Sequence, residues 1–290
     1  MPELPEVETL RRGLSAAITG RRILSVCILD RKIFSEPDEI TGSGAAGHRV
    51  GRVGRRGKVV ILFLDGSGSL LIHPKMTGQL VLTATGATVL AGGHPTPSML
   101  APMPNPTTRA VFRLDQAGCL YYNDARRFGW IRLAGPDPYA SDPFLRRLGP
   151  EPLGEAFTVA ALRDSLTRHA RAPVKAVLLN QAVVAGIGNI YADESLHHAR
   201  INPARRAGSL SLPETRRLHA AIRAILHDAI ETGGTSFAGY VNDFRGRPGY
   251  LDHAEVFRRQ GQPCRACGTM IVRTRVAGRA TNLCPRCQTV

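Results

Sequence analysis

The sequence predicts an α+β chain of several domains: a helix and a β-sandwich come first, a helical domain follows, and a small cysteine-rich ribbon ends the chain. Three observations carry this prediction. Between residues 23 and 133, seven short runs rich in β-branched and aromatic residues follow one another without intervening helices, which is typical of a sandwich or barrel. Four segments between residues 157 and 230 repeat apolar residues at helical spacing. The last thirty residues contain four of the six cysteines.

Each element has its own signal. Residues 4–18 predict an amphipathic helix with Pro5 in its first turn. Residues 84–106 are rich in Gly and Pro and weakly patterned, so we expect an insertion loop there. The later helices are expected at 157–169, 173–184, 189–199 and 213–230, and the ribbon strands at 269–273 and 280–283. The expected domains are a sandwich at 1–134, a Pro-rich linker at 135–155, a helical domain at 156–244 and a finger at 245–290.

The chain is strongly basic. Its 290 residues include 38 Lys and Arg against 23 Asp and Glu, a net charge of +15, and only four of the basic residues are lysines. This charge favours a polyanionic partner, because each neutralised phosphate releases condensed counterions; a basic surface without a nucleic-acid role is the alternative. No run approaches the roughly 20 apolar residues of a membrane span, and the N-terminal stretch lacks the pattern of a secretory signal. We therefore expect a cytoplasmic protein without a membrane partner.

The strongest local signal is a pair of Cys-x2-Cys motifs. Cys264 and Cys267 precede Cys284 and Cys287, with sixteen residues between the two pairs. This spacing predicts four thiolates around one tetrahedral Zn²⁺ per chain, and four sulfur ligands leave no position for a water, so the ion is expected to be structural. Two disulfides are the alternative, which the cytoplasmic expectation disfavours. Between the pairs, Arg279 is one of three arginines that the ribbon would present to phosphate.

The second signal is the N-terminal run MPELPE. Because Pro2 is small, we expect Met1 to be removed, which leaves a secondary amine of which roughly a tenth is neutral at pH 7. Attack of this amine on an aldehydic carbon gives an iminium that remains an electron sink. Glu3 and Glu6 place carboxylates beside it for acid–base catalysis. The alternative is an ordinary helix start with acidic residues in its first turn.

Several further motifs join these two. They are MPELPEVET at 1–9, Lys58 in RRGKVVIL, HPKMTG at 73–78, DARRFG at 124–129, GIGNIYADE at 186–194 and the cysteine ribbon with Arg279. In this order they resemble the formamidopyrimidine-DNA glycosylase family over nearly the whole chain. The resemblance implies a β-sandwich, a helix–two-turn–helix domain and a C-terminal zinc finger. It also implies a base-excision repair enzyme that removes oxidised purines from damaged double-stranded DNA and cleaves the abasic site by β,δ-elimination.

The resemblance assigns a role to each catalytic candidate. Pro2 resembles the Schiff-base nucleophile, Glu3 the proton donor and Lys58 the residue that assists β-elimination. Arg279 matches the position linked to δ-elimination and phosphate binding, and Glu6 looks like a supporting carboxylate. From the residues alone, Lys58 would read as an ordinary solvated lysine at a strand end.

DNA binding in this family requires the damaged nucleotide to be flipped out of the stack. The resemblance assigns Met76, Arg126 and Phe128 to the void that flipping leaves; sandwich core is the alternative for Met76 and Phe128. The remaining DNA-contact candidates are His73, Arg109, Arg171, Asn189 and Arg279.

Some positions depart from the family pattern. Pro74 and Lys75 are unusual beside the void-filling methionine, and Arg109 follows two threonines where many relatives carry a phosphate-binding histidine. An endonuclease VIII-type enzyme for oxidised pyrimidines, a non-catalytic binder of damaged DNA with the same fold, and a zinc-ribbon transcription factor are the competing interpretations. We expect a monomer associated with the nucleoid.

Overall fold

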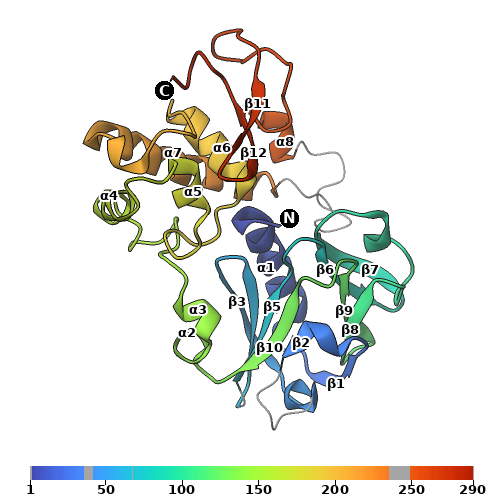
Figure 1. The fold of residues 1–290 in the computed structure, drawn as a ribbon. Helices are drawn as coiled ribbons and strands as arrows, with labels where there is room; N and C mark the ends of the chain where they lie inside the picture. Colours follow the sequence, from blue (N-terminus) through green and yellow to red (C-terminus); the bar gives the residue numbers. More distant parts are fainter. Residues whose placement is uncertain (1, 36–41, 67, 235–248, 290) are drawn as a thin grey trace. The chain divides into compact units, whose positions relative to one another are not determined.

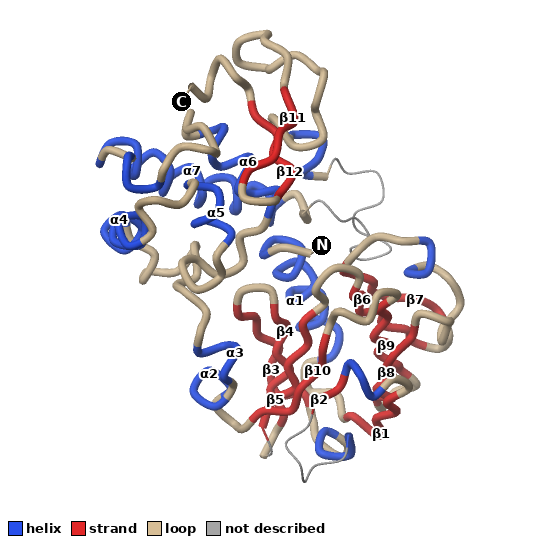
Figure 2. The backbone as a smooth tube through the Cα atoms, in the orientation of Figure 1, coloured by secondary structure: helices blue, strands red, loops and turns tan. Residues whose placement is uncertain are grey.

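The computed structural model describes residues 2–35, 42–66, 68–234 and 249–289. The chain divides into two compact units: Met1–Arg146 with Gly233–Arg247, and Arg147–Thr232 with Pro248–Val290. Figure 1 shows the order of the elements, and Figure 2 shows that strands predominate over helices in the first unit and helices over strands in the second. Within the described ranges, no helix is both long and apolar enough to cross a membrane.

The first unit is a sandwich of two five-stranded sheets, as the sequence predicts. One sheet contains β1 (Ile23–Ile28), β8 (Thr108–Leu114), β9 (Gly118–Asp124), β6 (Gly78–Ala84) and β7 (Ala87–Gly93), in that order. The other contains β2 (Phe34–Ser35), β10 (Trp130–Ala134), β5 (Gly68–His73), β4 (Val59–Leu64) and β3 (Val50–Arg56). Neighbouring strands are antiparallel, except that β2 pairs parallel with β10. Short 3-10 turns occupy Arg31–Ile33, Gly42–Ala45 and Pro97–Met99.

Helix α1 (Leu4–Ile18) belongs to the core of this sandwich. It packs against β7 of one sheet and β3 of the other, which Figure 1 also shows. Its apolar face, including Val7 and Leu14, joins one buried cluster with Leu62 and Phe112 from the two sheets. The helix therefore holds its own N-terminal turn in a fixed place relative to both sheets.

The expected loop at 84–106 is wrong in part. Residues Ala87–Gly93 form β7, which pairs antiparallel with β6 and places Leu90 opposite Leu82. The strand escapes sequence reasoning because its Ala and Gly residues weaken the apolar alternation on which strand prediction depends. After β7 the chain runs through the turn Pro97–Met99, and Met99 is buried.

The Pro-rich stretch after β10 also contains structure. Helices α2 (Pro138–Ser141) and α3 (Pro143–Arg146) each begin with a proline. The carboxylates of Asp137 and Asp142 accept backbone N–H groups of these first turns. Two of the prolines thus start helices, where a missing N–H costs nothing.

The second unit combines the helices with the ribbon. The helices are α4 (Val159–Arg168), α5 (Val174–Leu179), α6 (Asn189–His198), α7 (Leu212–Glu231) and α8 (Tyr250–His253), with a 3-10 turn at Ala207–Ser209. Helix α5 is five residues shorter than expected at its C-terminal end, because Asn180 leaves helical geometry and caps it. Helix α7 begins with a capping box between Ser211 and Glu214, and hydrogen bonding from Arg205 lowers the pKa of Glu214 to about 2.

The ribbon is a hairpin of β11 (Val272–Val276) and β12 (Arg279–Leu283). Its first strand lies three residues later than expected. The two turn residues, Ala277 and Gly278, both have left-handed backbone angles, with φ of 49° and 75°. This is the geometry of a two-residue type I′ turn, which sets the register of the two strands.

Candidate active site and DNA interface

The N-terminal turn of α1 gathers two carboxylates beside Pro2. Pro2, Glu3 and Glu6 are all buried. Glu3 caps the helix, and a carboxylate oxygen of Glu6 accepts the backbone N–H of Glu3 at 2.8 Å. A side chain at Gly234 would approach the Glu6 carboxylate to 2.8 Å, so the glycine permits a close approach of the chain at this point. The start of α1 therefore places two buried carboxyl groups in the turn that follows Pro2.

Lys58 occupies a tight turn that is fastened to α1. It forms the two-residue connection between β3 and β4 with Gly57, whose φ is 55°. Arg55 donates from Nε to the carboxylate of Glu8 at 3.0 Å and from a terminal nitrogen to the Gly57 carbonyl at 2.9 Å. Because Glu8 belongs to α1, these two bonds hold the turn against the helix. Lys58 is only 7% exposed.

His73 ends β5 and is buried as a neutral imidazole. Its Nδ1 accepts the backbone N–H of Lys75 at 3.0 Å, which leaves the ring proton on Nε2. The ring contacts Trp130 and Phe144 edge-on, with centroid separations of 5.4 and 5.5 Å. Burial lowers the pKa of His73 well below its ordinary value, and the charges of Lys75, Lys58 and Arg132 add to this effect. Any phosphate contact by His73 is therefore a hydrogen bond from a neutral group.

Two neighbouring loops present the residues expected to fill the void in DNA. Met76 lies in the loop between β5 and β6, and Arg126 and Phe128 lie in the loop between β9 and β10. Met76 is 37% exposed and Phe128 is 51% exposed, so neither side chain belongs to the sandwich core. The guanidinium of Arg126 lies 4.5 Å from the centre of the Phe128 ring. Exposed apolar groups beside a cation suit insertion between bases.

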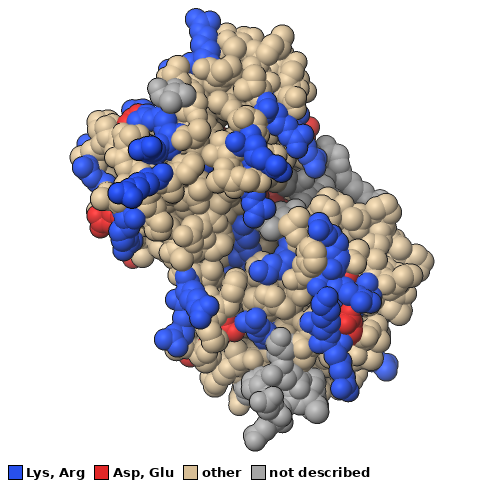
Figure 3. All heavy atoms as spheres, viewed as in Figure 1, with Lys and Arg blue, Asp and Glu red and all other residues tan. Residues whose placement is uncertain are grey.

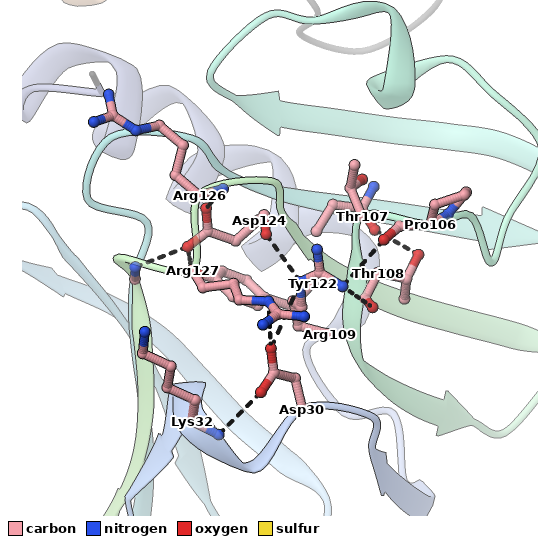
Figure 4. Close-up of polar contacts among 12 residues, drawn as sticks. Asp30, Lys32, Pro106, Thr107, Thr108, Arg109, Tyr122, Asp124, Arg126 and Arg127 are labelled. Carbon is pink, nitrogen blue, oxygen red and sulfur yellow. Dashed lines mark hydrogen bonds and ion pairs between the residues drawn. The ribbon is translucent and has the colours of Figure 1, made fainter.

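Arg109 is anchored within the protein, as Figure 4 shows. Its guanidinium donates to the carbonyl of Asp124 at 2.9 Å and to that of Pro106 at 3.0 Å, and it lies 3.9 Å from the carboxylate of Asp30. The same carboxylate pairs with Arg127 at 3.0 Å. Any phosphate contact by Arg109 would have to be made from this anchored position. Arg127 was not singled out from the sequence, because its pairing with Asp30 depends on the fold.

Two further candidates lie in the second unit. Asn189 is the first residue of α6, and the dipole of a helix favours an anion at its N-terminal end. Its side-chain oxygen is buried without a hydrogen-bond partner among the described residues. Arg171 is exposed. The position of Asn189 at the helix start suits phosphate binding by backbone N–H groups.

The four cysteines form a site that fits zinc. Their sulfur atoms all lie within 4.8 Å of one another, with Cys267 and Cys284 at 3.4 Å and Cys264 and Cys287 at 3.9 Å. Zn–S bonds of about 2.3 Å in a tetrahedron place sulfurs about 3.8 Å apart, close to these separations. The four residues therefore bind one structural zinc ion, as the spacing predicts.

Arg279 is the first residue of β12 and is exposed immediately after the ribbon turn. Lys175, from α5, lies behind this strand and donates from Nζ to the carbonyl of Ala280 at 2.9 Å and to the hydroxyl of Thr281 at 2.8 Å. Asp193, from α6, accepts the backbone N–H of Asn282 at 2.9 Å. These bonds position the strand that carries Arg279. Sequence reasoning missed them, although Lys175 stands out as one of four lysines.

Basic side chains occur on both units over the face drawn in Figure 3, with few acidic ones among them. The excess of positive charge is thus displayed on the surface. Such a surface favours the binding of a polyanion to each unit.

Comparisons with known proteins agree with this geometry. Residues 1–131 match the family model described as the formamidopyrimidine-DNA glycosylase N-terminal domain. Residues 148–240 match the formamidopyrimidine-DNA glycosylase H2TH domain, and residues 261–290 match a zinc finger found in FPG and IleRS. Together the three models cover most of the chain.

Relatives that match along nearly the whole chain are also named formamidopyrimidine-DNA glycosylase. The formamidopyrimidine-DNA glycosylase of Heliobacterium modesticaldum is 43% identical over 290 residues, which is 99% of this chain and 100% of that protein. The enzyme of Symbiobacterium thermophilum is 45% identical over 293 residues, which is 100% of this chain and 90% of that protein.

Solved structures show the same fold. The crystal structure of the MutM (Fpg) protein from Thermus thermophilus has a TM-score of 0.82 and 39% identity, and covers 99% of this chain and 98% of that one. A complex between Lactococcus lactis Fpg and DNA containing an abasic site has a TM-score of 0.86 and 31% identity, and covers 99% of this chain and 100% of that one.

Proposed function

The chain belongs to the formamidopyrimidine-DNA glycosylase family of base-excision repair enzymes, and on that premise we propose that it excises oxidised purines from duplex DNA through the amine of Pro2. Substrates of this class are 8-oxoguanine and formamidopyrimidines. The observation that carries the proposal is the buried N-terminal turn, in which Glu3 and Glu6 lie beside Pro2. We further propose that the enzyme acts as a monomer in the cytoplasm, in association with the nucleoid.

The first chemical step joins protein and sugar. The neutral amine of Pro2 attacks C1′ of the damaged nucleotide, the N–C1′ bond forms, and the base leaves with a proton. Glu3 supplies that proton as general acid, because its carboxyl is buried at the same helix start. Glu6, whose carboxylate accepts the Glu3 N–H, keeps this turn in place. Loss of the Pro2 N–H proton and cleavage of the C1′–O4′ bond, whose oxygen takes up a proton, then give an iminium between Pro2 and the ring-opened sugar.

The iminium then drives two eliminations. It acidifies the C2′ hydrogen, and loss of that proton expels the 3′-phosphate; a second elimination expels the 5′-phosphate. Lys58 assists the first elimination from its turn against α1. Arg279, on the zinc ribbon, binds phosphate and assists the second. Water then hydrolyses the iminium and releases the sugar remnant from Pro2, which leaves a one-nucleotide gap with phosphate at both ends.

Access to C1′ requires extrusion of the nucleotide, and the exposed loops of the first unit fit this task. Met76 and Phe128 would replace the lost stacking, while Arg126 would hydrogen-bond the base left opposite the lesion. The phosphate contacts that hold the duplex are assigned to His73, Arg109, Arg171, Asn189 and Arg279.

Borohydride trapping tests the proposal. The native protein and an 8-oxoguanine duplex, mixed with borohydride, should give a covalent adduct that peptide mapping locates on Pro2. A matched protein with an N-terminal tag should bind the same duplex without forming the adduct, because an amide nitrogen is not nucleophilic. Glu3→Gln should lose base excision and still nick a pre-formed abasic site. An adduct on Lys58, or undiminished cleavage by the tagged protein, would overturn the mechanism.

A non-catalytic binder of damaged DNA would bind the 8-oxoguanine duplex and form no adduct with it. Duplexes that carry oxidised pyrimidines belong in the same experiment. Faster trapping on these than on 8-oxoguanine would move the enzyme to the endonuclease VIII type of specificity.

A further inference from the structure

Asp124 links the two loops that carry the void-filling residues. It is the last residue of β9 and is completely buried. One carboxylate oxygen accepts the backbone N–H of Gly129 at 2.8 Å and the hydroxyl of Tyr122 at 3.4 Å. The other accepts the backbone N–H of Arg126 at 3.2 Å and the hydroxyl of Thr77. A single carboxylate therefore receives donors from both loops.

Thr77 hydrogen-bonds to both of the other groups in this connection, the Asp124 carboxylate and the Arg126 backbone. Its hydroxyl donates to the Asp124 carboxylate and accepts the backbone N–H of Arg126 at 3.1 Å. Met76 directly precedes this anchored threonine, and the backbone of Arg126 is itself anchored. The pairing of Gly78 with Asp124 between β6 and β9 brings the two loops together at their bases.

The packing around this carboxylate leaves little freedom. A Cβ at Gly129 would lie 1.8 Å from the Tyr122 hydroxyl, so only glycine fits there. The Arg126 side chain points away from the network around Asp30, which Figure 4 shows. The backbone of this loop is thus held firmly, while its functional side chain extends outward.

We propose that Asp124 is a positioning residue that makes the two loops one rigid wedge and thereby sets the selectivity for the base opposite the lesion. The proposal rests on the proposed function, because it takes Met76, Arg126 and Phe128 as the residues that enter the DNA. Asp124 itself is buried and does not face the duplex. It acts by fixing the Arg126 backbone relative to Met76, since base recognition tolerates displacements of only about 0.5 Å.

Two substitutions test the link from its two ends. Asp124→Asn keeps the shape but replaces one accepting oxygen by an NH2 group, which cannot accept from Gly129 or Arg126. Thr77→Val removes the hydroxyl on the other loop and is nearly isosteric. Asp115→Asn is the matched control, because Asp115 lies in the turn that precedes β9, at the far end of that strand from Asp124, where it pairs with Arg21.

The readout is the ratio of single-turnover excision rates opposite cytosine and opposite adenine. We expect this ratio to fall about fivefold in Asp124→Asn and in Thr77→Val, and no further in the double variant, because both remove the same connection. Trapping on a pre-formed abasic site should change by less than about twofold, since an abasic site has no base to unstack and its extrusion depends less on the wedge. A 2-aminopurine beside the lesion should report weaker insertion of the wedge.

The outcomes separate the possibilities. An unchanged ratio in a folded Asp124→Asn protein overturns the inference, and so does a parallel loss of excision and trapping, which would mean that Asp124 only maintains the fold. If Asp124→Asn does not fold, the ratio in Thr77→Val decides the matter in the same way. Failure of the proposed function is recognised separately, because the unaltered protein would then show no excision.

Discussion

The ammonium nitrogen of Lys175 lies 2.6 Å from a carboxylate oxygen of Asp193, and neither side chain is exposed to solvent. The two residues come from neighbouring helices, α5 and α6, and both also bind strand β12 of the zinc ribbon. The finger is therefore attached to the helical domain by a buried ion pair as well as by its chain connection. Burial raises the pKa of Asp193, and the charge of Lys175 opposes that rise.

Removal of the lysine should be costly. Lys175→Met leaves the Asp193 carboxylate buried and unpaired, which typically costs about 3–5 kcal/mol of unfolding free energy. Urea denaturation followed by circular dichroism would measure the loss. The double variant Lys175→Met, Asp193→Leu should recover much of it, because neither charge of the pair then remains buried. A loss below about 1 kcal/mol in the single variant would show that the pair is not important for stability.

Zinc removal should act on the ribbon first. Metal binding and folding are coupled in a unit of this size, so chelation or Cys284→Ser should unfold the ribbon and release Arg279 from its place. The helices should remain, because α4, α5, α6 and α7 pack mainly against one another. DNA affinity should fall while far-UV circular dichroism changes little. Full DNA affinity of a protein verified as metal-free would contradict this expectation.

His73 should resist protonation. Burial and nearby positive charges lower its pKa, so the ring should stay neutral well below the usual histidine midpoint of about 6.5. The unfolded chain then binds the proton first. The stability that the neutral ring contributes is therefore complete above a pH of about 6.5 and is lost as the pH falls through the lower folded-state pKa. An NMR titration of the ring C–H signals would measure this pKa, and a midpoint at the usual histidine value would refute the prediction.

Arg126 and Arg171 should differ in how they affect DNA binding. Arg126→Ala should weaken discrimination among bases opposite the lesion by about 1–3 kcal/mol, because a hydrogen bond to a base edge is lost. Arg171→Ala should weaken binding to all sequences alike and reduce the salt slope by about one, because a phosphate contact is lost. Excision assays with four opposite bases and a salt titration measure the two effects. Unaltered discrimination in Arg126→Ala would show that this residue does not read the opposite base.

The sequence predicts correctly those elements whose limits are marked by residues within the element itself. Helix α1 runs from Leu4 to Ile18 as expected, because Pro5 and the capping carboxylates mark its start and the apolar spacing marks its length. The zinc site is likewise predictable, because its four ligands lie in two short motifs whose spacing can be read directly. Strand β7 was not recognised, since Ala and Gly residues hide its pattern.

The connections between elements could not be read from the sequence. The Thr77 hydroxyl and the Asp124 carboxylate are 47 positions apart and meet only through the register of β6 and β9. Lys175 and Asp193 meet only through the packing of two helices. A charged residue in a sequence does not reveal whether it faces DNA or holds two parts of the protein together.

The burial of Lys175 also affects how this protein responds to amine chemistry. The chain has four lysines; Lys175 is fully enclosed and Lys58 is nearly so. Exposed Lys32 and half-buried Lys75 are then the two side-chain amines that an acylating reagent or an aldehyde cross-linker can reach. Although the chain is strongly basic, lysine-directed labelling should therefore modify it at few positions, and most of its positive charge should survive such treatment, because arginine side chains do not react.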